Sequence, residues 1–266
     1  MYYQTDKDLI IVKVGTNVLT DTTDSVEILD QQAFNQIGHE VCRLTDRGFG
    51  VIVVSSGAIT AGVLGDQKRR EDIDNIFALQ RYAARGWDIV VQQWKKSIGH
   101  QRVSSTLLTK REIHNEAMRT KALGVMSCCL SHGDVFVVNE NDTISDDEIK
   151  YGDNDTLAAA LAVECARAGL FASVKLVMLT NIDGLRTDQN DESTLLRKVT
   201  DISSVEKYAG LANNGHSRGG MMTKIKAAKV ATTVGVEVYI ADGRVNRAVE
   251  KALSRQIGTH FEANQA

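Results

Sequence analysis

The sequence predicts an α/β protein in which a mainly parallel sheet is covered by helices on both faces. Short apolar runs rich in β-branched residues alternate with amphipathic segments, which is the order that a parallel sheet requires. The chain has 266 residues, of which 43% are apolar and 24% charged, so it is long enough to bury one large core. No linker, internal repeat or low-complexity segment interrupts the alternation. We therefore expect a single domain over residues 1–266.

Six apolar runs are the candidate strands. Several are nearly continuous in Val, Ile and Leu and do not alternate with polar residues, which is typical of strands buried on both faces. The runs cover residues 9–14, 50–55, 103–108, 135–138, 174–180 and 236–240.

Eight segments between and after these runs have apolar residues at helical spacing. They cover residues 28–47, 58–64, 73–98, 113–131, 155–169, 203–208, 221–234 and 246–252. Polar residues follow several predicted strands, and open α/β sheets bind ligands beyond the carboxyl ends of their strands. We expect the functional site at that edge.

Composition disfavours several classes of function. The formal net charge of -3 and the isoelectric point near 6.1 argue against a surface devoted to nucleic acid. No apolar run approaches the about 18 residues that cross a bilayer, and the N-terminus lacks a basic segment followed by an apolar one. The four cysteines have no metal-binding spacing, so we expect reduced core residues in a cytoplasmic protein. The chain contains no proline, for which we have no physical account.

A cluster of polar residues lies between the predicted strand 135–138 and the predicted helix 155–169. Capping a helix uses one polar side chain, and a solvated turn would explain Asp153 or Asn154 alone. The cluster holds more carboxamides and carboxylates than a cap needs, so it predicts a ligand site. Its members are Asn139, Glu140, Asn141, Asp142, Asp153, Asn154 and Asp155.

Two lysines stand where phosphate chemistry is expected. Lys13 ends an almost wholly apolar run and is followed by Gly15, so its ammonium is predicted to reach the crevice at the strand end; an outward lysine on an edge strand is the alternative. Lys224 lies in the first turn of a predicted helix, where a cation opposes the helix dipole unless an anion is present. The alternative is a solvated lysine beside Lys226 and Lys229.

Glycine turns accompany both lysines. Ser56 and Gly57 follow the second predicted strand and lead into a helix whose free N–H groups can hold an anion. Gly219 and Gly220 precede Lys224 and permit close backbone approach. The chain has no P-loop, no Rossmann GxGxxG and no protein-kinase HRD and DFG pair, so phosphate binding must use separate loops.

Six motifs together resemble the glutamate 5-kinases of the amino acid kinase family. They are KVGTNVLT from Lys13, VSSGAITAG from Val54, VNENDTIS from Val138, YGDNDTLAA from Tyr151, LTNIDGL from Leu179 and RGGMMTKIKAA from Arg218. They occur in family order between residues 9 and about 243. The resemblance implies a three-layer αβα sandwich, the amino acid kinase fold. It also implies ATP- and Mg²⁺-dependent phosphorylation of the γ-carboxylate of L-glutamate to glutamyl 5-phosphate, the first step of proline biosynthesis.

The resemblance also implies roles for individual residues. Lys13 and Lys224 would neutralise charge on the transferring phosphoryl group, and Asp155 would orient both lysines. The glutamate would be held by Ser56, Asp142 and Asn154, in a pocket shaped by Asn139 and Asn141. No metal-ligating residue is implied. The nucleotide site would comprise Lys13, Gly15, Gly57, Thr180, Asn181, Arg218, Gly219, Gly220, Met221, Met222, Thr223 and Lys224.

The chain departs from the family pattern in three places. Asn181 stands where many members have aspartate. Arg85 and Trp87 replace a small residue and a glutamine near the expected glutamate pocket, where Trp87 reshapes the pocket or, alternatively, packs within its helix or at a subunit contact. The chain ends soon after Phe261, where many bacterial members continue into a PUA domain, so we expect a kinase domain alone.

The resemblance implies glutamate and ATP as partners, a homo-oligomer (dimer or tetramer) and functional coupling to glutamyl 5-phosphate reductase. Two other functions stay open. One is a different small-molecule kinase of the same family, acting on aspartate, carbamate, a nucleoside monophosphate or an isopentenyl phosphate. The other is a non-catalytic ligand sensor. The NEND and GDND motifs favour glutamate, and the presence of both Lys13 and Lys224 favours catalysis.

Overall fold

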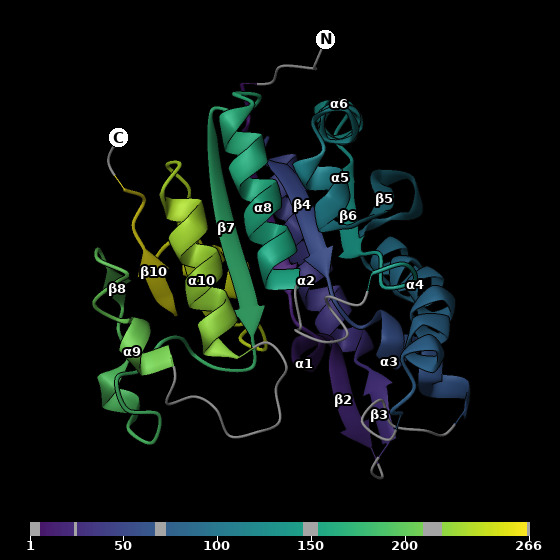
Figure 1. Cartoon of the computed structure of the whole chain (residues 1–266), viewed down its shortest axis with the longest axis horizontal. Helices are drawn as coiled ribbons and strands as arrows, with labels where there is room; N and C mark the ends of the chain where they lie inside the picture. The colour runs from purple at the N-terminus through teal and green to yellow at the C-terminus, as the bar shows by residue number, and fades with distance from the viewer. Residues whose placement is uncertain (1–5, 24–25, 67–72, 146–153, 210–219, 265–266) are drawn as a thin grey trace.

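Eight strands form one sheet in the part of the chain that the computed structural model describes, residues 6–23, 26–66, 73–145, 154–209 and 220–264 (Figure 1). In space they run in the order β5-β6-β4-β1-β7-β9-β10-β8. All neighbouring pairs are parallel except β9 and β10, so the predicted mainly parallel sheet is confirmed. The strands are β1 (Asp8–Val14), β4 (Gly50–Ser55), β5 (Val103–Leu108), β6 (Val135–Glu140), β7 (Ser173–Thr180), β8 (Lys198–Val199), β9 (Glu237–Asp242) and β10 (Thr259–Phe261).

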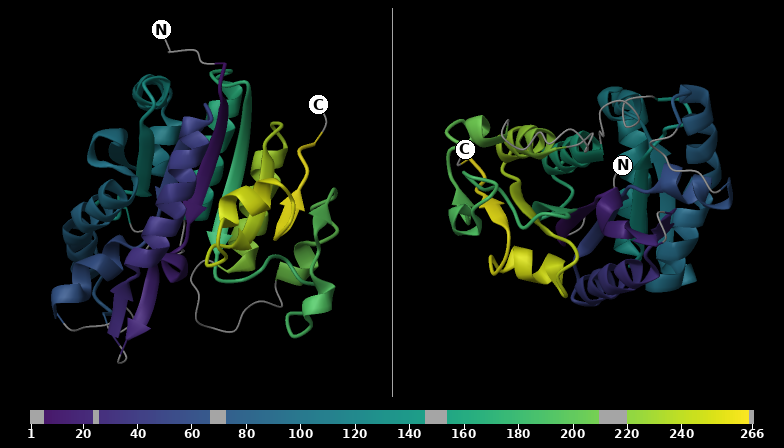
Figure 2. Two further views of the ribbon diagram at one scale, coloured as in Figure 1. Left: turned by 180° about the vertical axis from the view of Figure 1, so that it is seen from behind. Right: turned by 90° about the horizontal axis from the view of Figure 1, so that it is seen from below.

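Helices cover both faces of this sheet, which gives the predicted three layers; the right-hand view of Figure 2 shows the sheet between them. One face packs against α2 (Gln31–Asp46), α4 (Ile76–Ile98) and α11 (Ala248–Leu253). The other packs against α6 (Glu116–Ser131), α8 (Asn154–Arg167) and α10 (Met221–Thr232). No helix of the described residues is long and apolar enough to cross a membrane.

The central strand β1 is apolar on both faces until it reaches Lys13. Successive side chains of a strand point to opposite faces. Ile10 and Val12 therefore join the core under α2 and α4, whereas Leu9 and Ile11 join the core under α8. The same alternation directs Lys13 to the α8 face. The sequence of β1 thus delivers one ammonium group beneath the first turn of α8.

The prediction of a helix over residues 28–47 was wrong at its start. Ile28 lies in β3 (Val26–Leu29), which forms an antiparallel hairpin with β2 (Thr20–Thr23) past the carboxyl ends of the sheet strands (Figure 1). These segments are rich in the β-branched residues that favour strands. Helix α2 begins only at Gln31, because the Asp30 side chain accepts hydrogen bonds from the backbone N–H groups of Gln32 and Ala33.

Other predicted boundaries also moved to capping residues. The helix predicted over 113–131 is two helices, α5 (Lys110–His114) and α6, and Asn115 caps the second. The helix predicted over 73–98 starts after its cap Asn75. The segment predicted as a helix over 203–208 is helical only in α9 (Glu206–Ala209), and the short strands β8 and β10 were missed.

The described residues also form short helices at α1 (Thr16–Leu19) and α3 (Ala58–Val63), and 3-10 turns at η1 (Leu64–Asp66), η3 (His100–Arg102) and η4 (Glu192–Thr194).

Helices α3 and α4 pack with their backbones in close contact. A Cβ atom on Gly86 of α4 would lie 1.8 Å from the carbonyl oxygen of Ala58, and one on Gly62 of α3 would lie 2.0 Å from that of Tyr82. No other residue fits at either position without moving a helix. The two glycines therefore fix α4 against α3, whose first turn begins directly after Gly57.

Candidate active site

The carboxyl ends of the central strands meet at one edge of the sheet, and the predicted site residues gather there (Figure 1). Lys13 is near the end of β1, between β4 on one side and β7 on the other. Ser56 follows β4, Asn139 lies near the end of β6, and Thr180 ends β7. Parallel strands bring these residues together although they are far apart in the sequence.

The two lysines converge on one carboxylate. The Nζ atom of Lys13 is 2.8 Å from Oδ1 of Asp155, and the Nζ atom of Lys224 is 3.0 Å from Oδ2. Asp155 is fully buried, and each lysine is only 6% exposed. Both lysines are therefore internal, and the alternative of solvated surface lysines is wrong for each of them.

Asp155 stays ionised despite its burial. Desolvation opposes the charged form, but the nearby ammonium groups of Lys13 and Lys224 outweigh it and hold the pKa of Asp155 far below its ordinary value. Its place in the first turn of α8 adds a favourable helix dipole. Two ammonium groups and one carboxylate leave one positive charge in excess, in a site where few water molecules screen it. Such a group of charges is suited to bind an anion.

A network of neutral groups lies on the β4 and β6 side. The Asn154 amide donates to Oγ of Ser56 at 3.1 Å and to Oδ1 of Asn139 at 2.9 Å. Its own oxygen accepts from the backbone N–H of Glu140 at 3.2 Å. Ser56, Asn139 and Asn154 are each at most 4% exposed. One carboxamide thus joins β4, β6 and α8, and it brings together three of the residues predicted to surround the amino acid substrate.

The turn after β6 carries the remaining predicted substrate residues. Asn141 donates its backbone N–H to the carbonyl oxygen of Leu108 at 2.7 Å, and its side chain accepts from the Thr143 hydroxyl. Asp142 is 4% exposed and Glu140 is 1% exposed. Bonds to the end of β5 therefore hold this turn at the same edge of the sheet. Asp153 of the polar cluster lies outside the described residues.

Two glycine turns adjoin Lys13. The backbone N–H of Gly15 donates to the Leu179 carbonyl at 3.1 Å, and that of Ser56 donates to the Val14 carbonyl at 3.0 Å. Gly57 has a φ of 98°, a left-handed conformation that favours glycine, and it precedes α3. These bonds place the turns after β1 and β4 side by side, and the turn after β1 also contacts the end of β7.

Gly57 lies in the turn after β4, whereas the other predicted nucleotide residues of the described chain that follow lie on the β7 and α10 side. Thr180 accepts at its carbonyl a hydrogen bond of 2.9 Å from the N–H of Gly243, which follows β9. Gly220 precedes α10, Met221 is buried at its first position and Met222 is half-buried. Thr223 donates its hydroxyl to Asp155 and therefore meets the lysine site. Arg218 and Gly219 lie outside the described residues.

Comparisons with known proteins agree with this geometry. The model of the amino acid kinase family matches residues 8–242. This chain belongs to the amino acid kinase family. It is 34% identical over 260 residues to glutamate 5-kinase 2 of Pseudoalteromonas translucida, a match that covers 95% of this chain and 68% of that protein. It is 33% identical over 271 residues to glutamate 5-kinase of Clostridium perfringens, covering 98% of this chain and 97% of that protein.

A solved structure supports the fold. Carbamate kinase from Giardia lamblia bound to AMP-PNP superposes with a TM-score of 0.63 at 15% sequence identity, covering 97% of this chain and 99% of that one. The likeness extends over nearly the whole of both chains. The predicted amino acid kinase fold is therefore confirmed.

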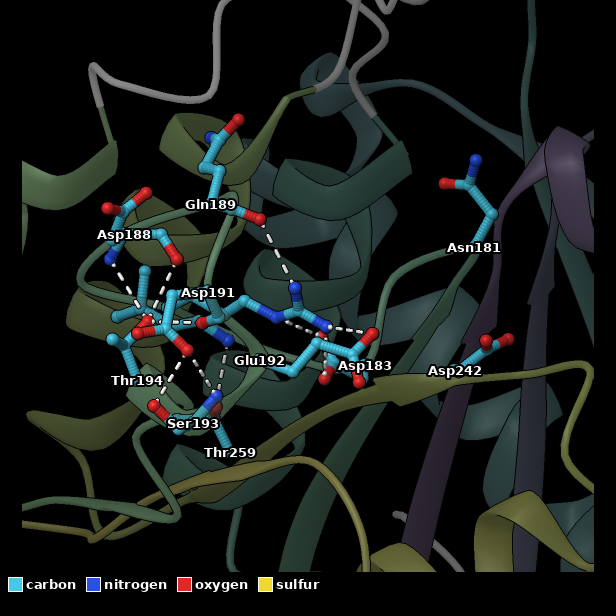
Figure 3. A network of polar contacts seen from close by, with 12 residues as sticks. Asn181, Asp183, Asp188, Gln189, Asp191, Glu192, Ser193, Thr194, Asp242 and Thr259 are labelled. Atoms are coloured by element: carbon cyan, nitrogen blue, oxygen red, sulfur yellow. Dashed lines mark hydrogen bonds and ion pairs between the residues drawn. The ribbon is translucent and has the colours of Figure 1, made fainter.

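Asn181 is exposed just beyond β7. Its backbone carbonyl accepts a hydrogen bond of 2.8 Å from the Arg244 guanidinium. The same guanidinium donates to both carboxylate oxygens of Asp242, at 2.9 and 2.7 Å. Figure 3 shows the Asn181 side chain apart from the polar network of the following loop. The Arg244 hydrogen bonds join the ends of β7 and β9, and they leave the Asn181 carboxamide at the edge of the sheet.

The loop that follows Asn181 is held by Arg186. Its guanidinium contacts both carboxylate oxygens of Asp183 at 3.1 and 2.9 Å, the Gln189 carbonyl at 3.2 Å and the Glu192 carboxylate at 3.4 Å. Figure 3 shows Asp183, Gln189 and Glu192 gathered around this contact. The loop next to Thr180 and Asn181 is thus built around one charged centre.

Arg85 and Trp87 of this amino acid kinase both make contacts of their own. The Arg85 guanidinium lies 3.0 Å from Oδ1 of Asp66, whose other oxygen accepts from the Tyr82 hydroxyl at 2.7 Å. The Tyr82 bond and then the Arg85 bond lower the pKa of Asp66. Trp87 is half-buried and packs against the core under α2 and α4. These contacts favour the packing alternative for Trp87.

Sequence reasoning gave no role to a pair of residues that supports the Ser56 turn. The indole of Trp94 donates to Oγ of Ser55 at 2.9 Å, and that hydroxyl donates to the Ser56 carbonyl at 3.1 Å. Ser55 and Trp94 are fully buried. Two consecutive serines at the end of an apolar strand indicated that hydroxyl groups would form hydrogen bonds at this turn. The partner on α4 is 39 positions away and could only be found in the folded chain.

Proposed function

We propose that this amino acid kinase transfers the γ-phosphoryl group of ATP to the γ-carboxylate of L-glutamate and produces glutamyl 5-phosphate, the first step of proline biosynthesis. The convergence of Lys13 and Lys224 on the buried Asp155, next to the neutral pocket of Ser56, Asn139 and Asn154, is the observation that carries the proposal. The two lysines lie where the reaction needs positive charge, because the anionic γ-carboxylate must be brought close to the anionic phosphoryl group. The resemblance to glutamate 5-kinases over at least 95% of this chain supports the choice of substrate.

The reaction needs no nucleophilic side chain. An oxygen of the γ-carboxylate forms a bond to the γ-phosphorus of ATP while the bond from that phosphorus to the bridging oxygen of ADP breaks. Negative charge spreads over the phosphoryl oxygens and the leaving group in the transition state. Lys13 and Lys224 stabilise this charge from preset positions, because Asp155 already holds both ammonium groups.

The pocket beside Lys13 is proposed to hold the amino acid. We propose that Ser56, Asn139, Asn141, Asp142 and Asn154 surround the amino acid, with the hydroxyl and amide groups near its carboxylates and the Asp142 carboxylate near its ammonium. Opposite charges attract, so a buried carboxylate is a suitable partner for the only cation of the substrate. The network around Asn154 keeps these groups in place before the substrate arrives.

ATP is proposed to lie on the β7 and α10 side of Lys13, beside the turn of Gly15, the end of β7 and the start of α10, with its phosphates reaching the turn of Gly57 after β4. Backbone N–H groups at these turns and at the α10 N-terminus suit phosphate oxygens. No group of three His, Cys, Asp or Glu side chains in the described residues could hold a metal. We propose that Mg²⁺ is bound chiefly by the nucleotide phosphates and water, as is usual for this ion, where it shields phosphate charge.

The product is an acyl phosphate, which reacts readily with water, so we propose that a reductase takes it up directly. The dimer or tetramer predicted from the sequence stays a prediction, which sedimentation of the purified protein would check.

The central test is glutamyl hydroxamate formation from glutamate, ATP, Mg²⁺ and hydroxylamine. We expect turnover with L-glutamate, and no more than about a hundredth of that rate with L-aspartate or N-acetyl-L-glutamate, which change the length or the charge of the substrate. ADP release is measured in parallel. Glutamate-independent ADP release, or a preference for another acceptor, would refute the proposal and favour another kinase of the family.

A further inference from the structure

The hydroxyl of Thr223 lies between the glycine turn of α10 and the carboxylate that holds the two lysines. Its Oγ1 is 2.8 Å from Oδ2 of Asp155 and 2.9 Å from the carbonyl oxygen of Gly220. A hydroxyl has one hydrogen, so it donates to one of these acceptors at a time. The ionised carboxylate is the stronger acceptor, because hydrogen bonds to charged groups are shorter and stronger than neutral ones.

Asp155 therefore contacts three different residues, two through hydrogen bonds and Lys13 through an ion pair. Lys13 contacts Oδ1, and Lys224 and Thr223 both contact Oδ2. The lysines are the groups that must share their N–H donors with phosphate oxygens during transfer. The Thr223 hydroxyl is uncharged and has its acceptors within the protein. Its bond can persist while the lysines engage the phosphate.

We propose that Thr223 is a positioning residue for phosphoryl transfer. It holds the Asp155 carboxylate in one orientation while Lys13 and Lys224 contact the phosphoryl group, and it ties the start of α10 to that carboxylate. This inference rests on the proposed kinase function. It adds a role for the Thr223 hydroxyl, which is directed at Asp155, to the sequence-based prediction that Thr223 lies in the nucleotide site.

Three variants test this role. Thr223→Val keeps the shape of the side chain but removes the hydroxyl, and Thr223→Ser keeps the hydroxyl. Thr232→Val is the matched control on the same helix, where the Thr232 hydroxyl donates to the Lys229 carbonyl at 3.3 Å and is remote from Asp155. We expect Thr223→Val to lower kcat about tenfold, as for loss of a hydrogen bond to a charged group, with both KM values within about twofold.

We expect Thr223→Ser to restore kcat to within about threefold of wild type and Thr232→Val to leave it unchanged. In an Asp155→Asn background, Thr223→Val should have no further effect on kcat, because its action passes through the carboxylate. Three results would overturn the inference: an unchanged kcat in Thr223→Val, a selective rise in the ATP KM, or fully additive losses with Asp155→Asn. Absence of glutamate-dependent turnover in wild type and in Thr232→Val would instead overturn the proposed function.

Discussion

The two sides of Lys13 are built from different chemistry. On the β4 and β6 side, Ser56, Asn139 and Asn154 are neutral and bonded to one another. On the α10 side, two ammonium groups share one carboxylate. Neutral hydrogen bonds are directional and discriminate between substrates, whereas charges act over longer distances and stabilise a changing charge distribution. The two sides of one buried strand therefore offer different chemistry, which fits the division that we propose between selection of the amino acid and transfer of the phosphoryl group.

The two sides also differ in their dependence on pH. The pKa of Asp155 is lowered in the folded protein, so its ion pairs contribute stability above the pKa of an unfolded aspartate. That contribution is lost only as the pH falls through the lower folded-state pKa. The hydrogen bonds from the Asn154 carboxamide to Ser56 and Asn139 join groups that do not titrate. Asp155 therefore stays ionised throughout the neutral range, and both sides keep their hydrogen bonds there.

The largest effect is expected where the charges are removed. Lys13→Ala and Lys224→Ala should each lower kcat about a thousandfold, because each lost ammonium contacts the phosphoryl group chiefly in the transition state. Steady-state kinetics and melting curves of the purified variants measure this. Lys229→Ala on α10, whose ammonium pairs with Glu206 at 2.7 Å, is the control and should keep its activity. A near-normal kcat in either folded lysine variant would refute the proposal that this side of the site carries out phosphoryl transfer.

A smaller, selective effect is expected on the neutral side. Asn154→Ala removes three hydrogen bonds of about 1 kcal/mol each and should raise the glutamate KM at least about tenfold, with the ATP KM nearly unchanged. Asp142→Ala should act in the same direction. Asn35→Ala is the control, since this residue bonds Ser97 on the opposite face of the sheet. If the ATP KM rises instead, the β4 and β6 side binds the nucleotide and our assignment of the two substrates to the two sides is wrong.

The sequence predicted where these residues lie because each signal was local. Lys13 is a charged residue in an apolar strand, and Lys224 is a cation in the first turn of a helix. Both placements are unfavourable unless an anion is near, and both lysines are indeed buried beside Asp155. The surplus of polar residues around Asn139 and Asn154 likewise exceeded what a helix cap needs. Family resemblance then linked motifs that periodicity alone could not bring together.

What the sequence missed depends on contacts between distant segments or on very short elements. The β2–β3 hairpin was missed, and the last two residues of β3 were predicted as the start of a helix, since Ile28 and Leu29 also fit helical spacing. Strands of two or three residues, such as β8 and β10, have too little pattern to recognise. The bonds from Trp94 to Ser55 and from Thr223 to Asp155 could be found only in the folded structure. Each joins residues far apart in the sequence, and tertiary packing brings the partners together.

The smallest effect on catalysis is expected for Trp87, which the sequence placed either in the amino acid pocket or in the packing of α4. Its half-buried ring contacts the core under α2 and α4. We therefore expect Trp87→Gln to lower the free energy of unfolding by about 2 kcal/mol through lost apolar burial, and to leave the glutamate and ATP KM values within about twofold.

Phe77→Gln on the same helix is the matched control, since Phe77 is 76% exposed and should contribute little stability. Denaturant unfolding, both KM values and sedimentation of the two variants decide the question. A selective change in the glutamate KM of a stable Trp87→Gln protein would extend the neutral side of the site onto α4. A loss of stability without that change would confine amino acid selection to the ends of β4 and β6 and the start of α8.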